Sequence, residues 1–482
     1  MDKITQQRLY AFCPFLLAAI LAGYTALSGL TLDHVADLSG ALRMRDGQIP
    51  YRDFYLPYGP VAFVLLWPFT LLFSDLSIAH IAASITLNVL ATGCMMRLAR
   101  ICVSENRLVI CCGVLTAIWF LPPFGSYFHD HLAYLFLIIG FLYFLKDREV
   151  LAGAAFVLAF HSKQTVGIVG VFCLFIALLF SSRRKTLTPS ALLAFLLSNL
   201  AFHILILSMI YYFSDFALYW ETTFTNPAYY SLFKPDKDPL NFLTALLMPF
   251  GIHPFQMFKE HGMGRISFYP IVLFVYYSFI RMWKLEGVQR FAIVFFLFST
   301  LFSASFLSRS FTHLILGLPL AIVVLLNASP IKTQNLIFAA VALIGLLQIR
   351  NQHPWAYSHL FPLTRPNYTF QKTTYQLGQF LSKQPEDFAI LDNREIMIPF
   401  FANKAPVNLP VVFFDGVVVP WMKEKRMIWE DRILSTLLDK KPKWIVRKKS
   451  LYNDLKNMES FLALHCKQEK AYEYFILLNC KE

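Results

Sequence analysis

The sequence predicts an α-helical polytopic membrane protein with a small α/β domain at its C-terminal end. Of its 482 residues, 57% are hydrophobic and only 15% are charged, and the mean hydropathy is +0.52. Because soluble domains carry about 25% charged residues, this chain would expose a large apolar surface to water, which a bilayer accepts as solvent. The 48 Phe and 22 Tyr residues suit lipid-facing and interfacial positions.

Apolar runs of nearly spanning length recur over residues 1–350. A helix needs about 20 apolar residues to cross the hydrocarbon core, and we expect about eleven transmembrane helices on that basis. They are predicted at 9–31, 76–97, 107–122, 131–146, 150–162, 165–181, 188–213, 268–283, 290–307, 312–328 and 333–349. The first run has no small-residue cleavage site, so we expect it to remain as a helix.

Basic residues set the predicted orientation. With a cytoplasmic N-terminus, every inner loop is basic, as the positive-inside rule requires; these loops contain Arg97, Arg100, Arg107, Lys146, Arg148, Arg183, Arg184, Lys185, Arg281, Lys284, Arg290 and Lys332. An apolar run at 61–73 would reverse this pattern if it crossed, so we interpret it as an interfacial or re-entrant helix. The net charge of +13 is divided among these short groups, a pattern that argues against nucleic-acid binding.

This topology leaves two large outer loops, 32–75 and 214–267, within a transmembrane module of residues 1–350. The second loop is rich in Pro and aromatic residues, which suits a position near lipid headgroups. After 350 the hydropathy pattern changes, and residues 351–482 predict an extracytoplasmic α/β domain. In it, 384–395 and 442–449 read as buried strands and 424–440 as an amphipathic helix.

The eight cysteines show no metal-binding spacing. Six lie in or beside apolar helices, where a thiol behaves as a small hydrophobic group. Cys466 and Cys480 lie in the polar tail. If the tail is extracytoplasmic, the oxidising compartment permits a disulfide between them, and the sequence leaves open whether it forms.

The first outer loop contains the leading catalytic candidate, Asp33. A short helix is expected to begin near Asp33 and to end at an Asp46-Gly47 turn. Asp33 has two interpretations. It is either the N-cap of that helix or a general base, because a carboxylate at a partly dry, apolar boundary has a raised pKa and takes a hydroxyl proton. Asp53, beside Arg52, is the second carboxylate.

Other polar residues are predicted at the same outer level. His129, Asp130 and His131 follow the third span; we favour contacts to phosphate or sugar over metal binding, because consecutive helical residues cannot all face one ion. Lys163 lies between two apolar spans, where it needs an anionic partner or extends its side chain to the interface. Arg309 and His313, four residues apart on one helical face, either bind the same ligand or anchor the helix at the interface.

Carboxylates and cations on one face of the membrane suit transfer from a phosphate leaving group. The carboxylate activates a hydroxyl while the cations stabilise the departing phosphate. Two alternatives remain: a lipid or solute transporter that uses the same polar pocket, although no internal repeat is evident, and a non-catalytic scaffold that presents the tail.

The order Asp33-His34, Gly47, Pro50-Tyr51-Arg52-Asp53-Phe54 and Tyr58-Gly59-Pro60 resembles the first outer loop of the GT-C superfamily of polytopic glycosyltransferases. The nearest groups are the bacterial protein-mannosyltransferase-like and aminoarabinose-transferase-like enzymes, and the resemblance covers residues 9–349. The His129–His131, His161–Gln164 and Arg309–His313 segments resemble later outer motifs of those groups. The chain departs from their pattern at His34, where many members have a second acidic residue, and at Tyr58, where many have His.

The resemblance implies a polyprenyl-phosphate-linked sugar donor such as an undecaprenyl-phosphate sugar, an outer-face active site, and Asp33 as the base. It implies donor-phosphate roles for Lys163 and Arg309, and an extracytoplasmic lipid, glycan or protein acceptor. The setting is expected to be a bacterial inner membrane. A divalent metal is left open, with His34 and Asp130 as weak candidate ligands.

Overall fold

The structure is a computed structural model that describes residues 3–26, 32–54, 56, 59–124, 127–180, 188–225, 277–278, 280–303, 317–327, 329–352, 369–391, 397–407, 423–448, 456–472 and 475–480. The chain divides into two compact units. Unit 1 comprises Met1–Gly29, Ile81–Leu205 and Asp238–Ala356, and unit 2 comprises Leu30–His80, Ile206–Lys237 and Tyr357–Glu482. The first outer loop and the tail therefore belong to the same unit.

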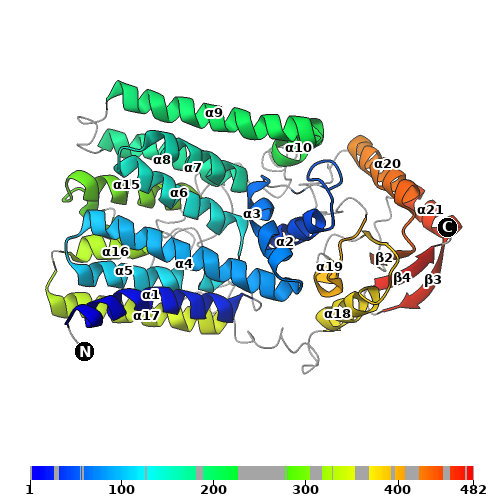
Figure 1. The fold of residues 1–482 in the computed structure, drawn as a ribbon, viewed down its shortest axis with the longest axis horizontal. Coiled ribbons are helices and arrows are strands. Elements are labelled where there is room, and N and C mark those ends of the chain that lie inside the picture. Colours follow the sequence, from blue (N-terminus) through cyan, green and yellow to red (C-terminus); the bar gives the residue numbers. More distant parts are fainter. Residues whose placement is uncertain are drawn as a thin grey trace. The chain divides into compact units, whose positions relative to one another are not determined.

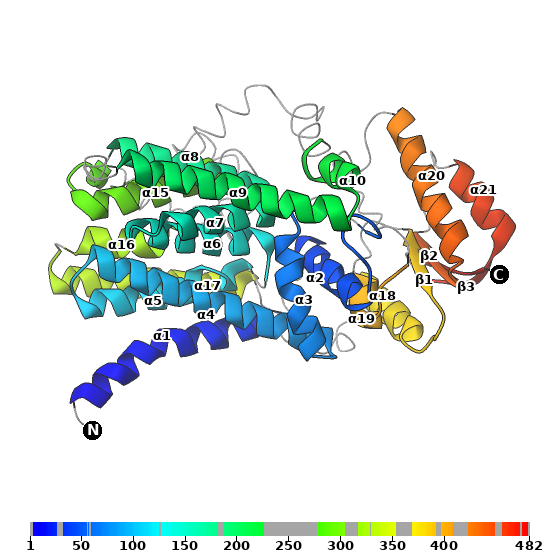
Figure 2. The ribbon, with the colours of Figure 1, turned by 45° about the horizontal axis from the view of Figure 1, so that its top comes forward.

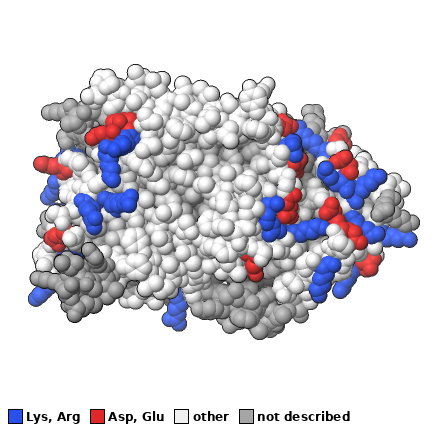
Figure 3. Space-filling model, in the orientation of Figure 1, with Lys and Arg blue, Asp and Glu red and all other residues white. Residues whose placement is uncertain are grey.

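Unit 1 is built from apolar helices that run side by side (Figures 1 and 2). They are α1 (Lys3–Thr25), α4 (Leu76–Cys102), α5 (Asn106–Trp119), α6 (His129–Leu145), α7 (Glu149–Ser162), α8 (Gln164–Phe180), α9 (Pro189–Phe213), α15 (Gly287–Ser303), α16 (Leu318–Leu326) and α17 (Ile331–Gln352), with a short 3-10 helix η1 (Pro122–Phe124). On the face drawn in Figure 3, charged side chains gather toward the left-hand end of these helices and are sparse along the middle of their length.

The predicted spans are confirmed as helices over most of the residues that the structure describes, while most of 268–283 and parts of 290–307 and 312–328 lie outside the described residues. Three described helices are long and apolar enough to cross a bilayer, namely Leu76–Cys102, Pro189–Phe213 and Ile331–Arg350, and several further apolar helices are shorter. The exact number of spans stays a prediction.

Small residues allow the helices of unit 1 to approach closely. A Cβ added at Gly167 of α8 would overlap the backbone of Phe160 in α7, so α7 and α8 are in direct backbone contact there. Close approach through glycine is typical of helix packing in membranes. Aromatic stacking fills the remaining space, as between Phe141 of α6 and Phe295 of α15, whose ring centroids are 4.3 Å apart.

Unit 2 contains the first outer loop and the tail. The loop forms α2 (Leu32–Arg45) and α3 (Val61–Leu72). The chain turns after α2 at Gly47, whose φ is +85°, which confirms the predicted helix and turn; such a φ favours glycine because a Cβ would be strained. The apolar run at 61–73 is confirmed as a helix, and its depth in the membrane stays a prediction. The short helix α10 (Phe216–Trp220) and the π-turn η3 (Glu221–Thr225) follow α9.

The tail is an α/β domain, as predicted. Its sheet has the order β1-β2-β4-β3, with β1 (Phe388–Leu391) parallel to β2 (Trp444–Lys448), and β4 (Phe475–Cys480) antiparallel to both β2 and β3 (Cys466–Ala471). Its helices are α18 (Thr369–Leu381), α19 (Met397–Ala402), α20 (Lys423–Lys440) and α21 (Lys456–His465). The two sheet faces have separate cores because successive strand residues point to opposite faces: α18 and α19 cover one face and α20 and α21 the other.

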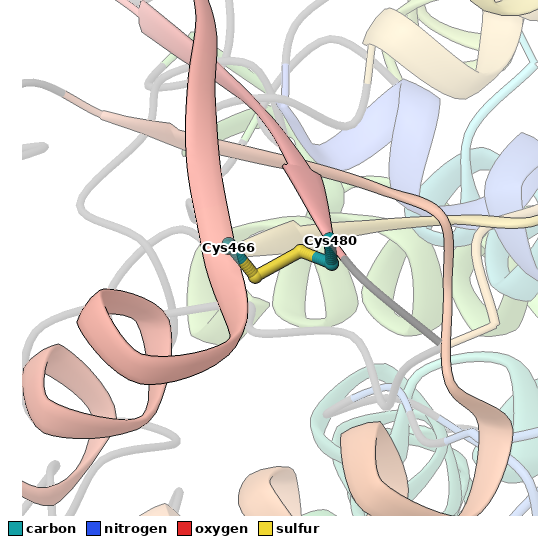
Figure 4. Close-up of a disulfide and its surroundings, with 2 residues drawn as sticks. All are labelled: Cys466 and Cys480. Atoms are coloured by element: carbon teal, nitrogen blue, oxygen red, sulfur yellow. A yellow bond between two sulfur atoms is a disulfide. The ribbon is translucent and has the colours of Figure 1, made fainter.

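Cys466 and Cys480 form a disulfide between β3 and β4 (Figure 4). The two residues are directly opposite each other in the antiparallel register. Of the two outcomes that the sequence leaves open, the structure has the bonded one.

Candidate active site

Lys163 lies at the centre of a polar cluster in unit 1. Its ammonium nitrogen Nζ is 3.3 Å from Asp130 Oδ1 and 3.2 Å from His129 Nε2. His129 Nε2 is in turn 3.5 Å from Asp130 Oδ1. We call these three residues the lysine cluster. The sequence predicted all three as site residues and the structure brings them together.

The local fold explains this meeting. Helices α6 and α7 pack tightly as neighbours, with Gly140 of α6 facing Phe156 of α7. A short turn joins them in which Asp147 has a φ of 54°. Two antiparallel helices joined in this way bring the start of the first beside the end of the second. Asp130 in the first turn of α6 therefore meets Lys163, which caps the end of α7.

Burial sets the electrostatics of the lysine cluster. The side chain of His129 is inaccessible and that of Asp130 is 10% exposed, while that of Lys163 is 21% exposed. A lysine at such a site is costly unless a carboxylate pairs with it, and Asp130 is that partner. The helix N-terminus of α6 also favours a carboxylate at this position. The cluster thus presents one partly accessible ammonium that is able to donate to an anionic oxygen.

The third member of the predicted triplet, His131, has a different setting. It is buried, and its ring packs against Phe120 and Phe128 at centroid distances of 5.5 and 5.8 Å. This aromatic environment is typical of a core histidine. A role for His131 at a substrate stays a prediction.

Arg52 and Asp53 form an ion pair in the first outer loop. Arg52 donates to both carboxylate oxygens of Asp53, at 3.1 and 2.9 Å, and the backbone N–H of Ile49 donates to Asp53 Oδ2 at 2.8 Å. Burial alone would raise the pKa of Asp53, but the hydrogen bonds from Arg52 and Ile49 and the positive charges of Arg52 and Lys440 lower it below its ordinary value. Asp53 is therefore a weakly basic carboxylate.

Tyr51, the residue before this pair, links the loop to the segment after α9. Its backbone C=O accepts from Asp215 N at 3.0 Å, and its buried ring meets Tyr219 edge-on at 4.9 Å. Burial, the neighbouring Tyr219 and the charge of Asp37 raise the pKa of the Tyr51 hydroxyl, and the nearby Thr223 offsets part of that increase. The φ of Tyr51 is 58°, which is rare for a tyrosine. The tyrosine is held there by these contacts.

Sequence reasoning missed two features. Asp37 is fully buried in α2 near Tyr51, and the sequence pattern assigned it no role. In unit 1, His161 Nε2 lies 3.1 Å from His203 Nδ1 of α9, two residues before Lys163. His203 had a usable signal, because an ionisable residue inside an apolar span is a functional candidate by default.

Several predicted site residues lie outside the described parts. Asp33 and His34 belong to the first turn of α2, but their side chains are not described. Position 33 precedes Asp37 by four residues, so the two positions share one face of α2. Arg309, His313 and most of loop 214–267 are not described at all. Their roles stay predictions.

A divalent metal does not fit the lysine cluster. Asp130 already faces the Lys163 ammonium, and a cation next to a carboxylate opposes the binding of a second cation. Within the described ranges no group of three or more His, Cys, Asp or Glu residues is arranged to hold a metal. The side chain of the other candidate ligand, His34, is not described.

Comparisons with known proteins show the fold. No family model and no curated protein sequence matches the chain. Among solved structures, ArnT from Cupriavidus metallidurans in the apo state matches with a TM-score of 0.57 and 13% identity over 96% of each chain. ArnT from the same organism bound to undecaprenyl phosphate matches with a TM-score of 0.55 and 12% identity, over 99% of this chain and 98% of that one. The chain has the fold of ArnT.

This result confirms the fold class predicted from the sequence and the fold implied by the resemblance of the loop motifs. Three of the described helices are long and apolar enough to cross a membrane. Archaeal oligosaccharyltransferase AglB from Archaeoglobus fulgidus, in complex with an inhibitory peptide and a dolichol-phosphate, matches more weakly. Its TM-score is 0.49 at 13% identity over 92% of this chain and 69% of that one.

Proposed function

We propose that this ArnT-fold protein is a glycosyltransferase that moves a sugar from a polyprenyl-phosphate carrier to an acceptor outside the cytoplasm. The observation that carries the proposal is the match, over 99% of the chain, to ArnT bound to undecaprenyl phosphate. The acceptor is a lipid, a glycan or a protein, and the setting is a bacterial inner membrane with the N-terminus inside.

The lysine cluster supports a phosphate-binding role. Helix α7 has 14 residues and is therefore about 21 Å long, shorter than the hydrocarbon core of about 30 Å. If Arg148 lies at the inner interface, Lys163 lies about 9 Å below the outer one. Its long side chain extends toward that interface, where a lipid-linked phosphate is accessible. Asp130 holds the ammonium in place at 3.3 Å, and the exposed part of Lys163 donates to the phosphate. Arg309 and His313 are proposed to complete this site.

Transfer needs a base as well as a leaving-group site. An acceptor hydroxyl oxygen forms a bond to the anomeric carbon while the bond from that carbon to the phosphate oxygen breaks. The phosphate leaves with the bonding electrons, and the hydroxyl proton passes to a carboxylate. We assign that carboxylate to Asp33. Asp53 is a poor base because its pKa is lowered, so its role is to hold Arg52 and the loop in place.

The test uses purified full-length protein and a panel of short-chain polyprenyl-phosphate sugars. Wild type should release polyprenyl phosphate in the presence of an envelope extract as acceptor source, and Asp33→Asn should lose transfer while keeping its thermal stability. The matched control is Asp75→Asn. Its carboxylate caps the next helix through Ser77 N, and an asparagine retains that cap, so its turnover should equal that of wild type.

Two outcomes would contradict the proposal. If Asp33→Asn turns over at the wild-type rate, Asp33 is not the general base. Binding of lipid-linked sugar without release of polyprenyl phosphate, unchanged in the mutant, favours the transporter that remained as an alternative, because a transporter moves its ligand without breaking a bond. That pattern would be followed by a flipping assay in sealed vesicles.

A further inference from the structure

A cleft of about 980 Å³ lies within unit 2, between the first outer loop and the tail domain. Its lining comes from three places: the turn after α2, the segment around α19 and the start of β1, and the last turns of α20. The lining residues are Asp46, Gly47, Gln48, Arg52, Asp53, Asp387, Asn403, Lys404, Ala405, Val407, Ser435, Thr436, Asp439 and Lys440. Apart from Gly47, Ala405 and Val407, every one of these residues is polar or charged. Small-molecule sites, by contrast, are mostly apolar.

Hydrogen bonds between distant parts of the chain fix the floor of this cleft. Arg45 donates to the side-chain and backbone oxygens of Asn403 at 3.0 and 2.7 Å. Ala405 N donates to Asp46 Oδ2 at 2.8 Å, and Gln48 Nε2 donates to the C=O of Pro406 at 3.1 Å. These four bonds join residues 45–48 of the outer loop to residues 403–406 of the tail, and they fix the relative positions of the two segments that form this side of the cleft.

The wall formed by α20 is fixed as well. Arg432 of α20 pairs with Glu221 at 3.4 Å, and Glu221 follows α10, whose first residues are bound to Tyr51 through Asp215. Ser435 and Thr436 both donate their hydroxyl protons to the C=O of Arg432, at 2.9 and 2.8 Å. Their oxygens retain acceptor capacity on the cleft side of the helix.

The charges of the lining are balanced in pairs. Arg52 pairs with Asp53 at 2.9 Å, Lys404 with Asp387 at 3.3 Å, and Lys440 with Asp439 at 3.2 Å. Lys404 also donates to the C=O groups of Pro385 and Glu386. The fourth carboxylate of the lining, Asp46, pairs with Arg45 at 3.2 Å, a residue that is not part of the lining. Each cation thus has its own carboxylate partner, and the lining has no excess positive charge for a phosphate.

We propose that this cleft binds the hydrophilic, polyhydroxylated part of the acceptor, namely a neutral or amino-substituted glycan. That the glycan is the acceptor of the reaction rests on the proposed function. That the ligand is a glycan rests on the cleft alone. Sugar hydroxyls donate and accept at once, so they match a surface of carboxylates, amides, hydroxyls and paired cations. The volume lies at the upper end of ligand sites, which run to about 1,000 Å³, and it accommodates an oligosaccharide.

The assignment separates two chemistries within the protein. The lysine cluster offers a partly accessible cation and suits the phosphate of the donor. The cleft offers balanced charge and hydrogen-bonding groups and suits a sugar chain. A phosphorylated glycan would place its negative charge beside a lining whose cations are already paired with carboxylates, which opposes binding.

The test measures binding of full-length protein in detergent to an immobilised array of short neutral, amino-substituted and phosphorylated oligosaccharides. One variant blocks the cleft: Ser435→Trp places a large ring on an exposed position of the α20 wall. Its matched control, Leu438→Trp, places the same ring on the same helix, at an exposed residue that does not line the cleft. The second pair tests charge: Asp439→Lys adds positive charge to the lining, and Asp431→Lys adds it elsewhere on the exposed surface of α20.

Wild type is expected to bind neutral or amino-substituted glycans in preference to phosphorylated ones. Ser435→Trp should weaken that binding by about tenfold or more, and Asp439→Lys should shift the preference toward phosphorylated glycans, while both controls behave as wild type. The proposal is overturned if wild type binds no glycan on the array, if it prefers phosphorylated glycans, or if Ser435→Trp binds like Leu438→Trp.

The array measures glycan binding in the absence of a lipid-linked sugar donor. Its result therefore does not depend on whether the protein transfers a sugar. If wild type transfers sugar while Ser435→Trp keeps both array binding and the KM for acceptor, the cleft proposal fails and the proposed function stands. If the array shows the expected pattern and no polyprenyl-phosphate sugar is turned over, the glycan site stands and the transferase proposal fails.

Discussion

Lys163 and Asp130 form an ion pair of 3.3 Å that joins the end of α7 to the start of α6. Thirty-three residues separate them in sequence, and only the α6–α7 hairpin brings them together. The pair keeps a positive charge at a partly buried position, which is the property that a phosphate site needs.

The first prediction concerns this pair. Lys163→Gln should abolish binding of polyprenyl phosphate, and Asp130→Asn should weaken it, because the ammonium loses the carboxylate that positions it. Breaking a buried pair from one side costs about 3–5 kcal/mol, and the partial exposure of Lys163 places the expected loss of stability below that range. Thermal unfolding and lipid binding of the two variants are to be compared with Lys146→Gln, which changes an exposed lysine at the other end of α6. Equal lipid binding by Lys163→Gln and Lys146→Gln would leave the pair with a structural role only.

The second prediction concerns the contact between α7 and α8. Gly167→Ala should destabilise the protein by about 1–3 kcal/mol, because its Cβ would overlap the Phe160 backbone and push α8 away from α7. Since Lys163 lies between these helices, transfer should fall as well. The control is Gly23→Ala in α1, where the nearest atom to an added Cβ is at an ordinary 3.5 Å. An unchanged melting temperature for Gly167→Ala would show that the helices separate without cost.

Much of this architecture is readable from the sequence because its signals are local. Long apolar runs predict the helices of unit 1, Asp46-Gly47 predicts the end of α2, and the apolar segments around Ile390 and Val446 predict β1 and β2. Strand β3 was not predicted, because its residues are polar and mostly exposed at the sheet edge and therefore lack the apolar pattern of a buried strand. Helices α18, α19 and α21 and strand β4 were missed as well.

The site is less readable because it depends on contacts between distant residues. The sequence indicated that Lys163 needs an anion, but Asp130 as its partner depends on how α6 and α7 fold back on each other. The left-handed backbone conformation of Tyr51 could not be predicted from its residue type, because tyrosine rarely adopts that conformation. The cleft joins residues near 50 to residues near 405 and 440, and no local pattern connects them.

The third prediction is a pH dependence at Asp53. Its pKa is lower in the folded protein than the ordinary carboxyl value of about 3.9, so the unfolded chain binds more protons as pH falls. The stabilisation is therefore fully present above the ordinary value and is lost as pH falls through the lower folded value. For a half-exposed pair it is about 0.2–1 kcal/mol.

The measurement for Asp53 is the difference in melting temperature between wild type and Asp53→Asn. We expect wild type to be more stable at neutral pH and the difference to narrow below about pH 4. Arg52→Gln should remove most of the same difference, because it removes the largest of the interactions that lower this pKa. A difference that stays constant down to the acid limit of folding would show that Asp53 acts through packing and not through its charge.

The last prediction concerns the disulfide between Cys466 and Cys480 and the compartment of the tail. Protein purified from membranes without reductant and then denatured should alkylate at six of its eight cysteines, and at all eight after reduction. The double variant Cys466→Ala/Cys480→Ala should lower tail stability by about 2–3 kcal/mol, because the bond closes a short loop in the unfolded chain; limited proteolysis measures this, with Cys13→Ala as the control for loss of a free thiol. Because disulfides persist in oxidising compartments, an oxidised pair in cells also supports an extracytoplasmic tail. Alkylation of all eight cysteines before reduction would contradict both the bond and that topology.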